Sequence, residues 1–79
     1  MTQKPYDAVE HNVTSKGITP TGHVETYVAE SPAAALEKLI YTRSLSNGKY
    51  RDECKIGPSG RTVTHGRVGY AVILARSNA

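Results

Sequence analysis

Few residues in this sequence could perform chemistry, and they are widely spaced. Histidine occurs as His11, His23 and His65, Cys54 is the single cysteine, and Glu10 and Glu25 are the nearest acidic companions. Structural zinc sites usually draw on ligands paired a few residues apart, and no histidine or cysteine here has such a close partner. We therefore expect no metal and no cofactor, and interpret the histidines as surface or strand-edge residues.

The spacing of the remaining polar residues selects no catalytic arrangement. Ser, Thr and His residues are numerous, but none is placed so as to identify a nucleophile with its base. Cys54 alternates with Ile56, which favours a small buried apolar residue. A domain this small also has little room to exclude water from an active site. We expect that the protein is not an enzyme.

A glycine-rich stretch, Gly57-Pro58-Ser59-Gly60-Arg61-Thr62, has the small residues of an anion-binding loop. A nucleotide-binding loop of that kind requires a Lys-Ser or Lys-Thr pair that opens a helix. This stretch instead leads into an alternating, β-branched segment. It is therefore interpreted as a hairpin turn.

Charge divides the chain into two unlike parts. Residues 1–37 hold two basic and five acidic residues, a net charge of −3, whereas residues 38–79 hold eight basic and two acidic residues, a net charge of +6. A strongly basic element attracts polyanions or acidic protein surfaces over about 8 Å at physiological salt. The split therefore indicates a binding function and identifies no reaction.

The candidate binding residues share a basic or aromatic side chain and lie beyond residue 42. They are Arg43, Lys49, Tyr50, Arg51, Lys55, Arg61, Arg67 and Tyr70. Arg51 and Lys55 have the same parity in a predicted strand, and Arg61 lies across the following turn, which predicts one cationic stripe. The stripe could neutralise phosphates or cover an acidic protein patch, with Tyr50 or Tyr70 as anchors. The alternative is an ordinary solvated charged face.

The length of 79 residues predicts one small domain over residues 1–79, with 1–4 and 77–79 as flexible tails. The sequence has no Phe or Trp and five Tyr, so the core is thin. We expect several tyrosines to be half-exposed, at the rim of the core or on a binding surface. A single cysteine, no apolar run of about eighteen residues and no signal-like start predict a cytoplasmic protein without a membrane span.

The elements that must position these residues can be located by their patterns. Residues 23–30 alternate as a strand, and Ser31-Pro32 is a typical start for an amphipathic helix that ends near Ser44. Residues 6–13 form a weaker strand candidate, and residues 14–22 a Thr/Gly/Pro loop.

The second half predicts three further segments. Residues 50–56 alternate as a strand, Gly57–Gly60 turns the chain, and residues 61–65 return antiparallel. After Gly66, residues 68–75 form the most apolar strand. The order β-β-α-β-β predicts an α+β fold of two layers, a four- to five-stranded, mainly antiparallel sheet with one amphipathic helix. One helix cannot cover both faces, so the other face must be solvated, paired with a second copy or docked on a partner.

The segment Thr26–Leu39, a strand that enters a capped helix, resembles the strand-helix unit of very small bacteriophage proteins that disable host machinery, such as RNA polymerase inhibitors and anti-CRISPR proteins. The resemblance is one of pattern over this segment, and these families share no functional motif. It implies a non-enzymatic inhibitor that occupies a surface of a host protein or nucleoprotein complex, for example a CRISPR-Cas effector, in the host cytoplasm. A free-standing nucleic-acid-binding domain is the alternative, and a homodimer is compatible with both.

Overall fold

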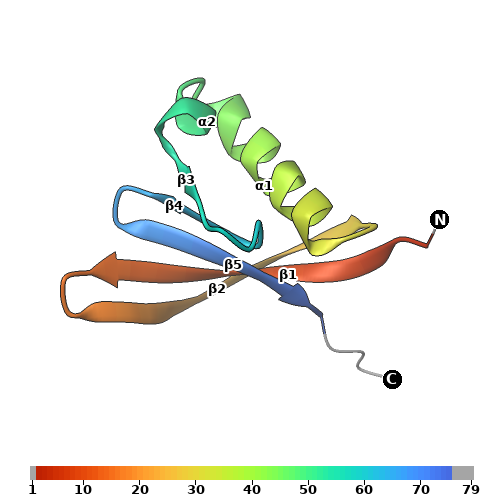
Figure 1. The fold of residues 1–79 in the computed structure, drawn as a ribbon, viewed down its shortest axis with the longest axis horizontal. Coiled ribbons are helices and arrows are strands. Elements are labelled where there is room, and N and C mark those ends of the chain that lie inside the picture. Colours follow the sequence, from red (N-terminus) through yellow and green to blue (C-terminus); the bar gives the residue numbers. More distant parts are fainter. Residues whose placement is uncertain (1, 76–79) are drawn as a thin grey trace.

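A five-stranded antiparallel sheet forms one layer of the protein, and two helices form the other (Figure 1). The computed structural model describes residues 2–75. The strands are β1 (Lys4–Thr14), β2 (Gly17–Ala29), β3 (Lys55–Ile56), β4 (Thr62–His65) and β5 (Val68–Leu74), and the helices are α1 (Pro32–Ser46) and α2 (Tyr50–Glu53). The order across the sheet is β2-β1-β5-β4-β3. The predicted α+β architecture is confirmed. The predicted tail at 77–79 lies outside the described residues.

The first two strands form a long hairpin that the sequence did not reveal. The loop predicted at residues 14–22 is wrong, because the chain turns within Ser15 and Lys16 and β2 already begins at Gly17. Thr14 stabilises this tight turn, since its Oγ1 accepts from the backbone N–H of Lys16 at 3.2 Å. Pro20 is tolerated in β2 because β2 is an edge strand, whose outer side needs no ladder hydrogen bond.

The helix predicted after Ser31 is confirmed and extends to Ser46. The Ser31 side chain accepts a hydrogen bond from the backbone N–H of Ala34 at 3.1 Å, which satisfies one of the donors left unpaired at a helix start. One side of α1 packs on the sheet, and its buried residues are Ala35, Leu36, Leu39 and Ile40. Their spacing places these side chains on a single stripe.

The strand predicted at residues 50–56 is wrong over its first half. Residues Tyr50–Glu53 form the short helix α2, and only Lys55 and Ile56 pair with β4. The turn after α1 leads directly into α2, because the backbone C=O of Asn47 accepts from Tyr50 N–H at 2.9 Å. Tyr50 is buried, and Cys54, four residues further along the chain, packs against the core. A spacing of four residues is compatible with a helical turn and with an alternating strand, and the packing of Tyr50 selects the helix.

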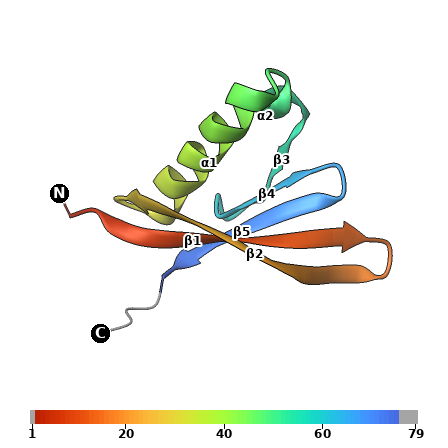
Figure 2. The ribbon, with the colours of Figure 1, turned by 180° about the vertical axis from the view of Figure 1, so that it is seen from behind.

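Both helices lie on the same side of the sheet, as the two opposite views show (Figures 1 and 2). Tyr6, Ala8, Val63, Tyr70 and Val72 of the sheet pack against α1 in the core. Within residues 2–75, no helix or loop covers the other face. We call it the open face. In the part of the chain that is described, no helix is long and apolar enough to span a membrane.

Candidate binding surface

Arg43, one of the predicted binding residues, belongs to a polar cluster between α1 and the sheet. Its Nη2 forms an ion pair with Glu25 of β2 and donates to the Tyr70 hydroxyl of β5 at 2.8 Å. The guanidinium also lies over the Tyr70 ring, 5.0 Å from its centroid. Glu25 further accepts from the Tyr27 hydroxyl at 2.7 Å and faces His23 Nε2 at 3.0 Å. Arg43 therefore ties α1 to two strands.

The same cluster continues to Glu10 of β1. The Tyr70 hydroxyl donates to Glu10 Oε2 at 2.8 Å, and the Thr21 hydroxyl donates to Glu10 Oε1 at 2.8 Å. These hydrogen bonds lower the pKa of Glu10, because they stabilise the ionised carboxylate, and the bond from Thr21 has the larger effect. Burial raises the pKa of Tyr70. A carboxylate of lowered pKa is a poor proton acceptor, so this arrangement suits structure better than acid-base work.

The tyrosines predicted as anchors lie in the core. Tyr50 and Tyr70 are 6% and 7% exposed, so neither side chain is presented on the surface. Tyr50 stacks on His65 with ring centroids 4.8 Å apart, and burial raises its pKa. The Tyr50 hydroxyl is buried without a hydrogen-bond partner among the described residues. Tyr41, on the outer side of α1, is the exposed tyrosine. The expectation of half-exposed tyrosines holds for Tyr27 alone.

The predicted cationic stripe is also wrong as a geometric unit. Arg51 lies on α2 instead of a strand, and its Nη1 pairs with Glu37 Oε2 of α1 at 3.2 Å. It therefore shares no strand face with Lys55. The other predicted cations, Lys49, Lys55, Arg61 and Arg67, are exposed, and none forms an ion pair within residues 2–75.

The open face is largely aliphatic. Successive side chains of a strand point to opposite faces of the sheet. Tyr6, Ala8, Tyr70 and Val72 pack on α1, so the residues next to them in β1 and β5 point to the open face. On this side lie Val9, Val13, Ile18, Val24, Val28, Ala71 and Ile73, with Asp7 and Thr26 joined by a 2.7 Å hydrogen bond. Ile18, Val24, Val28 and Ile73 are 67%, 47%, 50% and 53% exposed.

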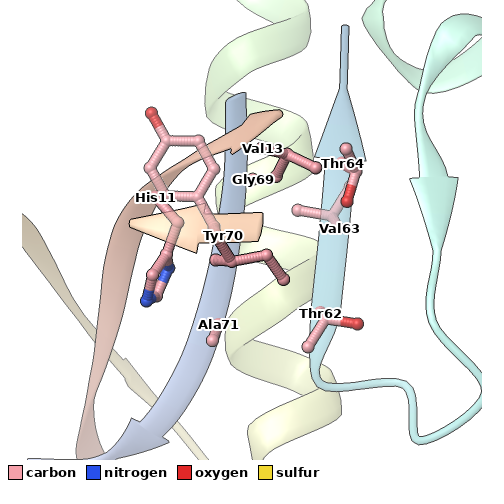
Figure 3. Close-up of a pocket in the computed structure, with 9 residues that line it drawn as sticks. His11, Val13, Thr62, Val63, Thr64, Gly69, Tyr70 and Ala71 are labelled. Carbon is pink, nitrogen blue, oxygen red and sulfur yellow. The ribbon is translucent and has the colours of Figure 1, made fainter. Parts of the chain in front are cut away.

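A hollow of about 200 Å³ interrupts the open face near the β1–β2 turn (Figure 3). Its lining residues come from β1, β2, β4 and β5, and they are His11, Val13, Ile18, Thr62, Val63, Thr64, Gly69, Tyr70 and Ala71. Val13 and Thr64 pack closely over Gly69, because a Cβ atom there would lie 3.2 Å from Val13 Cγ2 and 3.5 Å from Thr64 Oγ1. Gly69 and Ala71 contribute no large side chain to this part of the face.

Lys38 blocks one point of the β2 edge, and the β3 edge is short. The Pro5 C=O accepts a hydrogen bond from Ala75 N–H and therefore points toward β5, away from β2. Pro5 and Val28 are thus opposite each other in the β1–β2 ladder without hydrogen bonds between them. The backbone groups of Val28 then face the outer edge, and its C=O accepts from Lys38 Nζ. A lysine in this position hinders strand addition. The opposite edge, β3, is two residues long.

The titratable cluster and the hollow lie on opposite faces of the sheet, so the described residues do not bring them together in one site. No group of three or more His, Cys, Asp or Glu residues in the described part of the chain could hold a metal ion. Sequence reasoning anticipated an uncovered face but missed the hollow. The signal for it was the run of small residues at equal parity in two neighbouring strands, Thr62 and Thr64, Gly69 and Ala71.

Comparisons with protein-family models, with curated proteins and with solved structures found no match for this chain.

Proposed function

We propose that the protein is a small non-enzymatic binding protein whose open face contacts a protein partner. The observation that carries the proposal is the exposure of large aliphatic side chains on that face, which include Ile18, Val24 and Val28. Contiguous apolar surface of this kind marks interaction sites on soluble proteins. Because Lys38 and the shortness of β3 restrict the sheet edges, side chains of the face, and not strand addition, would make the contact.

The composition of the open face favours protein over single-stranded nucleic acid. Sheets that bind single strands stack the bases on aromatic side chains. Here Tyr6, Tyr50 and Tyr70 are buried on the helix side, and Tyr41 lies on α1. Of the described residues, His11 is the one whose strand parity places an aromatic side chain on the open face. Aliphatic side chains suit the apolar centre of a protein interface.

The specific form of the proposal is an inhibitor that occupies a surface of a host protein or nucleoprotein complex. Its support is the resemblance of residues 26–39 to small phage inhibitors, together with the separation of the titratable cluster from the hollow. A protein that acts by occupation needs complementary surface and no convergent catalytic groups.

The test compares one substitution on each of two exposed apolar surfaces. Val24→Glu places a charge on the open face, and Leu45→Glu places the same charge on α1, where Leu45 is 70% exposed. Tagged wild type and variants are used to capture partners from candidate host lysate treated with nuclease, after circular dichroism confirms folding. Val24→Glu is expected to lose the partner that wild type and Leu45→Glu retain. Loss with Leu45→Glu and retention with Val24→Glu would reverse the assignment.

Nucleic-acid binding is the second candidate function. The observation that favours it is the set of four exposed cations without an ion pair in the described residues: Lys49, Lys55, Arg61 and Arg67. Binding through phosphates weakens steeply between about 50 and 200 mM salt. Micromolar binding of random DNA or RNA with that salt dependence supports this function, and no binding at low salt removes it.

A further inference from the structure

We propose that the hollow on the open face receives one apolar side chain of an acidic segment in the partner protein. This inference rests on the proposed function and assigns the part of the open face that anchors the partner. Interfaces commonly place an apolar anchor in a pocket at their centre and charged groups around it. The hollow and its surroundings provide both parts.

The size of the hollow fits a side chain better than a metabolite. Its volume of about 200 Å³ is smaller than the roughly 300–1,000 Å³ of typical ligand sites. It exceeds the roughly 150 Å³ of an apolar cavity known to admit benzene, so a leucine-sized group can enter it. The methyl groups of Val13, Ile18 and Ala71 provide the apolar contact.

The charges beside the hollow are positive. Lys55 pairs with Thr64 across β3 and β4, and paired residues of an antiparallel ladder face the same side, which places Lys55 next to the hollow. Arg67 adjoins Val13, since the Arg67 C=O accepts from Val13 N–H at 2.8 Å. Neither cation has an ion pair in the described part of the chain.

The one carboxylate on the open face is too far away to neutralise these cations. Among the described residues only Asp7 is placed there, four residues from His11 along β1. That spacing corresponds to about 14 Å, which is more than the Debye length of about 8 Å at physiological salt. Glu53 lies two residues before Lys55 but on the helix side, where its Oε1 faces His65 Nε2 at 3.0 Å. On the open face, the field beside Lys55 and Arg67 therefore favours carboxylates on the partner.

A second copy of this chain is a poorer occupant. A symmetric pair would bring Lys55 and Arg67 of both copies into one interface, where like charges repel.

Short synthetic peptides provide a direct test. The probe is acetyl-Asp-Glu-Leu-Glu-Asp-amide, with peptides in which Ser replaces Leu, or Lys replaces each acidic residue, as controls. Titrations are followed by ¹⁵N–¹H nuclear magnetic resonance, and the shifts are expected at Gly69 and Ala71. We expect the Leu peptide to bind at least about tenfold more tightly than either control, because each control removes one of the two contacts.

Two pairs of variants locate the contact on the protein. Ala71→Leu fills the hollow and is expected to weaken binding at least about tenfold, whereas Ala33→Leu, on the exposed side of α1, makes the same change elsewhere. Lys55→Glu is expected to weaken binding about threefold, and Lys49→Glu, on the helix side, is its control. The Lys55 pair keeps the test valid if Ala71→Leu does not fold.

The outcomes separate this inference from the proposed function. Equal affinity for the Leu and Ser peptides, or no binding at millimolar concentration, overturns the anchored site. Tighter binding of a single-stranded oligonucleotide than of the Leu peptide also overturns it, in favour of nucleic acid. If a captured partner is lost with Val24→Glu but retained with Ala71→Leu, the open face binds protein without the hollow, so the inference fails and the proposed function stands.

Discussion

Removal of the hydroxyl groups of Tyr50 and Tyr70 is expected to change stability in opposite directions. The two side chains are equally buried, at 6% and 7% exposure, and replacement by Phe leaves each ring in place. The Tyr70 hydroxyl accepts from Arg43 Nη2 and donates to Glu10 Oε2, both at 2.8 Å. The Tyr50 hydroxyl is buried and has no partner in the described residues.

The magnitudes follow from these surroundings. Hydrogen bonds to charged groups contribute about 1.5–3 kcal/mol, and less where the charged groups are partly solvated, so Tyr70→Phe is expected to cost about 1–2 kcal/mol of unfolding free energy. A buried hydroxyl without a partner costs about 1–3 kcal/mol, so Tyr50→Phe is expected to stabilise the protein by about 1 kcal/mol. In a domain of this size, about 1 kcal/mol shifts Tm by roughly 4–8 °C.

Urea unfolding followed by far-ultraviolet circular dichroism measures both changes. Tyr41→Phe is the control, since Tyr41 is 61% exposed and its hydroxyl has no described partner to lose. Its effect should lie within about 0.5 kcal/mol of zero. Destabilisation by Tyr50→Phe as large as that by Tyr70→Phe would show that the hydroxyl of Tyr50 is hydrogen-bonded, and the reasoning would then be refuted.

Two further predictions concern Glu10 and the cap of α1. Because hydrogen bonds hold the pKa of Glu10 below 4.5, its contribution is present above pH 4.5 and is lost as the pH falls through the folded-state pKa. Urea titrations at several pH values should therefore show that Glu10→Gln lowers the free energy of unfolding, relative to wild type, by about 0.5 kcal/mol at pH 7 and by less at acidic pH. A difference that does not change with pH would contradict this. Ser31→Ala should cost about 1 kcal/mol in urea unfolding through loss of the cap, whereas Ser46→Ala, at the exposed end of α1, should cost little. Equal effects of the two Ser→Ala changes would remove the capping argument.

The sequence by itself determined the elements whose local signals agree with their environment. Ser31-Pro32 and the apolar stripe that follows predict α1, because capping and period act within a few residues. Gly66 turns the chain between β4 and β5 with φ of +64°, a conformation that glycine adopts without steric cost. The α+β class and the presence of an uncovered face also follow from element order and helix count.

Tertiary structure decided everything that depends on contacts between distant residues. Residues 50–53 alternate like a strand, yet they form a helix because Tyr50 packs under α1 and stacks on His65. Arg43 and Tyr70 join α1 to the sheet, since Glu25 and Glu10 come within hydrogen-bonding distance of them only in the folded chain. The hollow likewise arises where separate strands place small side chains side by side, an arrangement fixed by strand register and not by any local pattern.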